Sequence, residues 1–216
     1  MPLLTELHFC PPAAWFAAAL TAPGGVLLER HEHYQKQTFR NRALILTAQG
    51  PKPLTVPVRG GASQHKQRAD EILIDTSHDW ARPHCRTLQS AYNRTPYFLY
   101  YADPLLALLL APPPTLYALN RCILDLLLGW LAPALPVAET NSWQAGYTGR
   151  EVLDRRQFYT PDAPPDRMRV SPYPQAFGAG FVSGLSILDV LFALGPGTAA
   201  FLRATAAPSV VSAPAD

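Results

Sequence analysis

Short apolar runs separated by proline- and glycine-containing breaks mark the first thirty residues. Residues 3–8 and 26–29 are runs of strand length. Between them, residues 13–20 are apolar and alanine-rich and follow two prolines, which favours a helix with proline at its first turn. The pattern therefore predicts a βαβ-like unit at the start of the chain.

The next apolar runs predict a hairpin and a further strand. Residues 42–47 and 53–58 lie on either side of Gly50, which suits a turn between two paired strands. Residues 71–75 are long enough and apolar enough to add another strand.

Helical periodicity dominates the remainder of the chain. We expect one helix over residues 76–101, a second over 115–131, and a third that begins at 186–192 and resumes at 197–202. Strands followed by helices indicate the α/β class, as a single mixed-sheet domain with a helical C-terminal half.

The domain is expected to cover residues 1–203, and residues 204–216 are expected to form a flexible C-terminal tail. Residues 139–174 are rich in polar residues, proline and glycine and have weak periodicity. They predict a long loop over the site or over a sheet edge.

A leucine-rich stretch at residues 104–135 has the composition of a membrane span but not its continuity. Prolines at 112–114 break it, and Arg121 and Asp125 interrupt its second half. These two side chains are one helical turn apart and can pair on an exposed stripe. We expect a buried helical pair or a surface for a protein partner, with no integral membrane segment.

Charge is distributed unevenly although the formal net charge is only +2. Residues 30–70 contain only two acidic residues, Glu32 and Asp70, beside eight basic ones: Arg30, Lys36, Arg40, Arg42, Lys52, Arg59, Lys66 and Arg68. Such a segment attracts a phosphate or carboxylate, or it is simply a solvated face. No nucleic-acid-binding motif accompanies it, and the rest of the chain balances the charge, so no nucleic-acid partner is expected.

Three cysteines at wide spacings, Cys10, Cys85 and Cys122, suit reduced thiols in a cytoplasm better than a disulfide framework. The first residues lack the pattern of a secretory signal. We therefore expect a cytoplasmic protein.

The segment from His31 to Arg42, HEHYQKQTFRNR, concentrates groups that carry chemistry. His33 beside Lys36 suits acid/base work, because a nearby cation lowers the pKa of an imidazole and favours its neutral form. Lys36, Arg40 and Arg42 can hold an anionic substrate. The alternative is that these cations pair with acidic residues elsewhere in the chain.

Other chemistries have weaker signals. Glu29, His31 and His33 would share one face of a strand and could bind a metal, but no second cluster matches them, so no metal or other cofactor is expected. Cys10 lacks the surroundings of a known cysteine nucleophile. Ser186 and Asp189 lack the G-x-S-x-G elbow of a serine hydrolase.

Several of these segments together resemble the WbqC-like proteins of bacteria, which occur among genes for surface polysaccharides. The resemblance is carried, in the family's order, by FCPPAAWF at 9–16, HEHYQKQTFRNR at 31–42, LTVPV at 54–58, IDTSHDWARPHCRTLQSAYNRTPYF at 74–98 and GLSILDVLFALGP at 184–196. It implies that Lys36, Asn41 and Arg42 are site residues, with His33 where the family has an amide or an imidazole. The family usually has P-N-L-S at the last motif, where this chain has residues 183–186 without the asparagine.

The resemblance also implies work on sugars, through transfer of an acyl, aminoacyl or glycosyl group to a nucleotide-linked amino sugar. We expect His33, Lys36 and Asn41 to be catalytic, with His33 as general base and Asn41 orienting a carbonyl or hydroxyl group. The expected substrate-binding residues are Tyr34, Gln35, Arg40 and Arg42, and His33, Lys36, Asn41 and Arg42 are expected to converge on one pocket. The alternative is a noncatalytic ligand-binding or scaffold protein of the same pathway.

Overall fold

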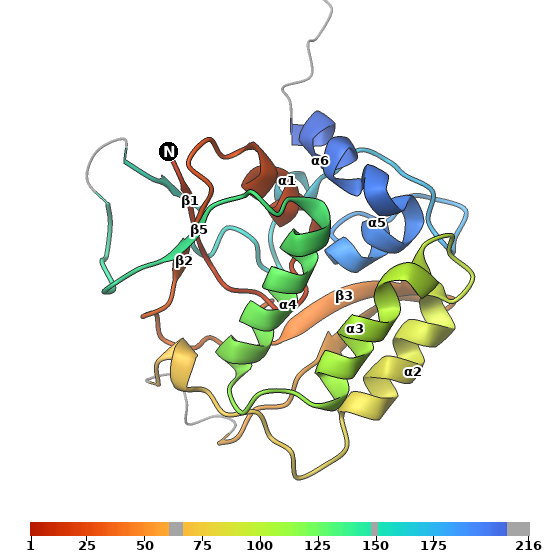
Figure 1. The fold of residues 1–216 in the computed structure, drawn as a ribbon, viewed down its shortest axis with the longest axis horizontal. Helices are drawn as coiled ribbons and strands as arrows, with labels where there is room; N and C mark the ends of the chain where they lie inside the picture. The colour runs from red at the N-terminus through yellow and green to blue at the C-terminus, as the bar shows by residue number, and fades with distance from the viewer. Residues whose placement is uncertain (61–66, 148–150, 207–216) are drawn as a thin grey trace, which may run out of the picture.

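The structure is a computed structural model that describes residues 1–60, 67–147 and 151–206 (Figure 1). It has the α/β class expected from the sequence, with helices in the C-terminal half. Lys66 of the basic segment lies outside the described residues, as do residues 207–216 of the expected tail.

A parallel sheet is built around the N-terminal βαβ unit, as the pattern predicts. Its four strands lie in the order β5-β2-β1-β6, where β1 is Leu3–Glu6, β2 is Val26–Glu29, β5 is Val137–Glu139 and β6 is Leu153–Asp154. The helix between β1 and β2 is α1 (Ala13–Thr21). The register pairs Leu3 with Val26 and Glu6 with Glu29, so β1 and β2 end together.

A separate antiparallel hairpin follows, formed by β3 (Arg42–Thr47) and β4 (Gly50–Thr55). The second strand begins earlier than the expected 53–58, because Gly50, with φ of +99°, ends a tight turn directly after β3. No residue of the hairpin pairs with the parallel sheet among the described strands. The parallel and antiparallel strands expected from the sequence therefore form two separate sheets, a parallel sheet and a hairpin.

Residues 71–75 do not form the expected strand. A 3-10 turn, η2 (Ala69–Glu71), is followed by two isolated bridges, Leu73 to Thr115 and Ile74 to Val58. The segment passes between two partners and pairs with each through a single residue, so no ladder develops.

The described residues form six α-helices around the sheet and the hairpin. These are α1, α2 (Ala81–Tyr92), α3 (Phe98–Leu110), α4 (Leu116–Leu131), α5 (Ile187–Leu194) and α6 (Thr198–Ala206), which follows α5 after a short 3-10 turn. The expected helix over residues 76–101 is two helices, α2 and α3, which lie side by side (Figure 1). Pro96 explains the break, because it lacks a backbone N–H and disfavours helical geometry at Thr95. The Thr95 hydroxyl instead donates to the Tyr92 carbonyl over 2.6 Å.

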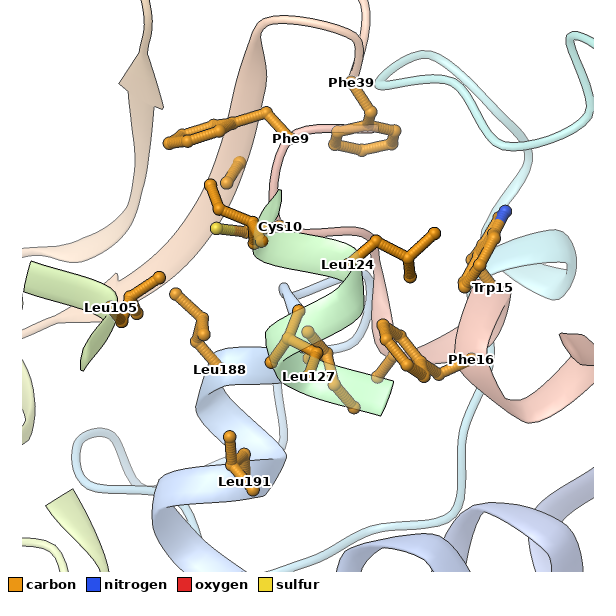
Figure 2. Close-up of a cluster of buried hydrophobic side chains, with 14 of the residues drawn as sticks. Phe9, Cys10, Trp15, Phe16, Phe39, Leu105, Leu124, Leu127, Leu188 and Leu191 are labelled. Atoms are coloured by element: carbon orange, nitrogen blue, oxygen red, sulfur yellow. The ribbon is translucent and has the colours of Figure 1, made fainter. Parts of the chain in front are cut away.

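The leucine-rich stretch forms most of α3 and all of α4, and most of its leucines face the core, although Leu110 is exposed. Figure 2 shows Leu105 of α3, Leu124 and Leu127 of α4 and Leu188 of α5 in one cluster of buried apolar side chains. The predicted exposed pair forms, with Arg121 Nε 2.9 Å from Asp125 Oδ1.

Helices α5 and α6 together, over Ile187–Ala206, are the one described stretch long and apolar enough to cross a membrane by length and composition. Half of its most apolar window is buried inside the fold. Both helices pack against α1, so the stretch is accounted for as a core element of the α/β domain.

Candidate functional site

The carboxyl ends of β1 and β2 bring buried acids together. Glu6 and Glu29 are the last residues of the two strands, are paired in register and are fully buried. In parallel sheets ligands bind in the crevice beyond the carboxyl ends of the strands. Chain segments from both strand ends and from the loop after β5 meet at this edge.

A polar cleft of about 420 Å³ opens there. Its volume lies within the range of small-molecule sites, roughly 300–1,000 Å³. Its lining combines carboxylates, one arginine, one imidazole, amides and an exposed indole: Glu32, His33, Gln35, Trp143, Ala145, Asp154, Arg156 and Gln157.

Arg40 holds two of the acids behind the cleft. Its Nε lies 2.7 Å from Glu32 Oε1, its Nη2 lies 3.7 Å from Glu6 Oε1, and its side chain is almost wholly buried. Burial raises the pKa of Glu32 in spite of the charge-assisted hydrogen bonds from Arg40. Burial also raises the pKa of Glu6, but the facing His8 and Arg40 outweigh it and lower that pKa to about 2.

Arg156 holds a second pair of acids at the wall of the cleft. Its Nη2 lies 2.6 Å from Asp154 Oδ2 and its Nη1 lies 3.3 Å from the buried Glu29. The Thr140 hydroxyl donates to Glu29 Oε1 over 2.8 Å. Hydrogen bonds and charge from Arg156 lower the pKa of Asp154, although burial opposes them, so Asp154 is an anion at neutral pH.

His8 completes the buried cluster from the β1 side. Its Nε2 lies 3.5 Å from Glu6 Oε1, and among the described residues neither ring nitrogen has a hydrogen-bond partner. The ring packs edge-on against Trp15 and Phe39. The Gln157 backbone N–H donates to both Glu6 oxygens, over 3.1 and 3.0 Å, which fixes this carboxylate in place.

Two of the residues predicted from the sequence line the cleft. His33 is exposed there and lies in a single antiparallel bridge with Arg68, and Gln35 is half-buried. Both follow β2 directly, so the end of that strand positions them.

Three other predicted residues are buried within the fold. Arg40 pairs with the acids described above, which is the pairing that the sequence left open as the alternative. Asn41 Nδ2 donates to the Val56 carbonyl over 3.0 Å and so ties the motif to the chain after β4. Tyr34 is buried, and burial raises its pKa to about 12.

The structure does not bring Lys36 and Arg42 to this cleft. Lys36 is half-buried outside the cleft lining, and Arg42 opens β3 and lines a different cavity. The expected convergence of His33, Lys36, Asn41 and Arg42 on one pocket is therefore not found, because the chain turns between Gln37, with φ of +58°, and β3.

Sequence reasoning missed most of the acidic residues of the site and the loop that faces them. Glu6 and Glu29 could have been identified as site candidates from the sequence, since each is a charged residue at the end of an apolar strand of a βαβ unit. Trp143, Asp154 and Arg156 lie in the segment interpreted as a loop, which in fact adds β6 to the sheet. No sequence signal places them opposite His33.

The structure also shows the surroundings of the residues considered for a metal site, a cysteine nucleophile and a serine hydrolase. In residues 1–60, 67–147 and 151–206 no three His, Cys, Asp or Glu side chains are grouped so as to hold a metal ion. Cys10 lies among apolar side chains (Figure 2), and burial raises the pKa of its thiol far above the ordinary value. Ser186 caps α5 through the Leu188 N–H, and Asp189 accepts hydrogen bonds from Tyr92 and Tyr173.

The cleft can bind a polar ligand and move a proton. Asp154 and Glu32 accept hydrogen bonds from hydroxyl or ammonium groups, and Arg156 and Gln157 donate to oxygen atoms. His33 is placed to exchange a proton with a bound group. The flat face of Trp143, 55% exposed, offers an apolar surface beside these polar groups.

Comparison with known proteins identifies the chain's relatives. The model of the WbqC-like protein family matches residues 8–145 and 130–200. An uncharacterised protein of Mycobacterium tuberculosis is 31% identical over 205 aligned residues, which cover 79% of this chain and 84% of that protein. No solved structure matches the chain significantly.

Proposed function

This chain belongs to the WbqC-like protein family, and from that premise we propose that it is a cytoplasmic transferase acting on a nucleotide-linked sugar in bacterial surface polysaccharide biosynthesis. The observation that carries the proposal is the polar cleft at the carboxyl ends of β1 and β2. The resemblance noted in the sequence implies the sugar substrate, and the groups that line the cleft have the chemistry to bind one.

The balance of charge in the cleft favours an amino sugar. Glu32 and Asp154 line it and Glu6 and Glu29 lie behind it, and within the described part of the chain two arginines, Arg40 and Arg156, pair with these four acids. An ammonium or hydroxyl group is a better partner for this surface than a bare phosphate. The diphosphate of the substrate would then lie toward the cleft mouth.

His33 is the proposed general base. It is exposed at the cleft and belongs to the motif that carries the family resemblance. It would accept the proton that the attacking amino or hydroxyl group of the sugar loses as this group bonds to the transferred group. In the same transfer the bond between that group and its donor breaks, and the donor's carrier departs with the electron pair of that bond. Gln35 and Gln157 would position the sugar, and Trp143 would pack against its ring.

The test is turnover of a nucleotide-sugar panel. The protein is incubated with nucleotide-linked amino sugars together with acyl-, aminoacyl- and glycosyl-donor mixtures, and mass spectrometry detects a sugar of increased mass. His33→Ala should abolish the product without unfolding the protein. The matched control is His78→Ala, which changes an exposed histidine outside the cleft lining and should retain full turnover.

A noncatalytic scaffold protein is the second candidate. The observation in its favour is a set of exposed apolar side chains on α3: Leu99, Tyr100 and Leu110. A scaffold protein would bind a partner through these residues and give no product in the turnover assay. Loss of product in His33→Ala together with unaltered turnover in Leu99→Ser and Tyr100→Ser would decide for the enzyme.

A further inference from the structure

A second cavity of about 370 Å³ lies away from the polar cleft, between the hairpin and the C-terminal segments. Its lining is mostly apolar and comes from three parts of the chain: Phe39, Arg42, Ala43, Leu44 and Pro53; then Pro161, Ala163, Pro165 and Met168; and finally Ser183 and Gly184. No residue of the polar cleft is among them. The size is that of a small-molecule site.

The walls of this cavity are held by backbone hydrogen bonds. The Ser186 N–H donates to the Leu44 carbonyl over 2.7 Å and fixes the segment around Gly184 against β3. The Ala163 N–H donates to Thr160 and the Arg167 N–H donates to Pro164, which close two turns in the facing wall. A cavity with fixed walls is a preformed site and not a gap between mobile loops.

Among the residues that the structure describes, Arg42 is the single charged one in the lining. In residues 1–60, 67–147 and 151–206, its buried Nε has no hydrogen-bond partner and no carboxylate lies within ion-pair distance of its guanidinium. A buried donor is nearly always paired in proteins, and a guanidinium binds carboxylates best. The cavity therefore combines an apolar enclosure with one uncompensated cationic donor.

We propose that this cavity is a binding site for an apolar carboxylate, with the hydrocarbon chain among Phe39, Ala163 and Met168 and the carboxylate on Arg42. The site is additional to the sugar cleft, and binding to it does not depend on the proposed transferase activity. Arg42, which the family resemblance implies is a site residue, then binds a ligand in this cavity and not in the sugar cleft. The basic motif thus serves two sites, with His33 at one and Arg42 at the other.

Calorimetric titration at neutral pH with octanoate, butyrate and octan-1-ol tests the site. Octanoate should bind at least tenfold more tightly than butyrate, because the longer chain buries more apolar surface. Octan-1-ol should bind more weakly than octanoate, because it lacks the charge. Arg42→Gln should weaken octanoate binding at least tenfold and leave octan-1-ol binding unchanged.

Two further variants keep the test decisive. Ala163→Phe fills the cavity and should weaken octanoate and octan-1-ol alike. Lys52→Gln removes a cation from the neighbouring strand β4 outside this cavity and should leave both affinities unchanged. Circular dichroism confirms folding of each variant. Failure of octanoate to bind the wild-type protein at millimolar concentration, or equal binding to the wild type, Arg42→Gln and Ala163→Phe, would overturn the proposal.

Discussion

Replacing Arg40 by methionine should destabilise the protein strongly at neutral pH. Arg40 is 2% exposed and compensates two buried carboxylates, Glu32 at 2.7 Å and Glu6 at 3.7 Å. Breaking a buried ion pair by removing one partner typically costs about 3–5 kcal/mol. Glu6 contributes to this cost, because its pKa is lowered from 4.5 to about 2 although burial opposes the shift, but His8 lowers that pKa as well as Arg40, so only part of the Glu6 contribution depends on the guanidinium.

The effect should depend on pH in a defined direction. A carboxyl group whose folded pKa is lowered stabilises the fold above its unfolded pKa, and this contribution is lost as the pH falls from about 4.5 toward 2. At pH 3 the unfolded chain has already protonated Glu6 while the folded protein keeps it largely ionised, so part of this contribution is lost there. The deficit of Arg40→Met should therefore be larger at pH 7 than at pH 3.

The assay is urea unfolding of the wild type and the variant at both pH values. At pH 7 the urea curves should show a loss of about 4 kcal/mol, and thermal unfolding of the same two proteins should show a Tm lower by on the order of 10 °C. Adding Glu32→Gln should restore part of the stability. Arg82→Met, which removes an exposed pair with Asp79, should cost less than about 1 kcal/mol. A deficit below about 1 kcal/mol for Arg40→Met, or one that is equal at pH 7 and pH 3, would refute this reasoning.

Three further outcomes are expected. Tyr92→Phe leaves Asp189 Oδ2 and the Leu46 N–H without their shared hydroxyl and should lower the unfolding free energy by about 1–3 kcal/mol in urea; an unchanged midpoint would contradict it. Gly195→Ala should lower the unfolding free energy by more than about 1 kcal/mol, because φ is +52° and the new Cβ would lie 2.4 Å from the Tyr97 ring. Gly197→Ala, which has open space around it, should unfold at nearly the wild-type temperature. Iodoacetamide should modify the exposed Cys122 in the native protein but not the buried Cys10. Peptide mass spectrometry measures the modification, and a result in which Cys10 is modified before Cys122 would contradict the core packing.

Local patterns in the sequence are sufficient for the βαβ unit, the hairpin and the capped helix α4. Each is specified within about thirty residues by apolar period, proline and turn chemistry. The sequence predicts one helix across the boundary between α2 and α3, although Pro96 marks that boundary, because the apolar period continues across the break. The strand predicted at residues 71–75 does not form, because a strand needs a ladder of paired residues and the partners of this segment lie in two other parts of the fold.

The candidate site was predictable only in its first half. The motif at residues 31–42 stands out by composition, and His33 and Gln35 do line the cleft. The facing wall, with Trp143 and Arg156, is brought there by the pairing of β6 with β1 over a long sequence separation. The division of the motif between two cavities depends on the turn at Gln37, which composition does not reveal.

The indole N–H resonance of Trp143 offers the most direct test that a nucleotide-linked sugar binds in the cleft. Trp143 is 55% exposed and lines the cleft, whereas Trp15 is fully buried and donates to the Thr5 hydroxyl over 3.1 Å. In 15N-labelled protein titrated with nucleotide-linked amino sugars, we expect the Trp143 peak, assigned with Trp143→Phe, to shift saturably while the Trp15 peak stays fixed. A sugar that calorimetry shows to bind while the Trp143 peak stays unmoved, or a full panel that moves neither peak, would contradict the assignment of the cleft as the sugar site.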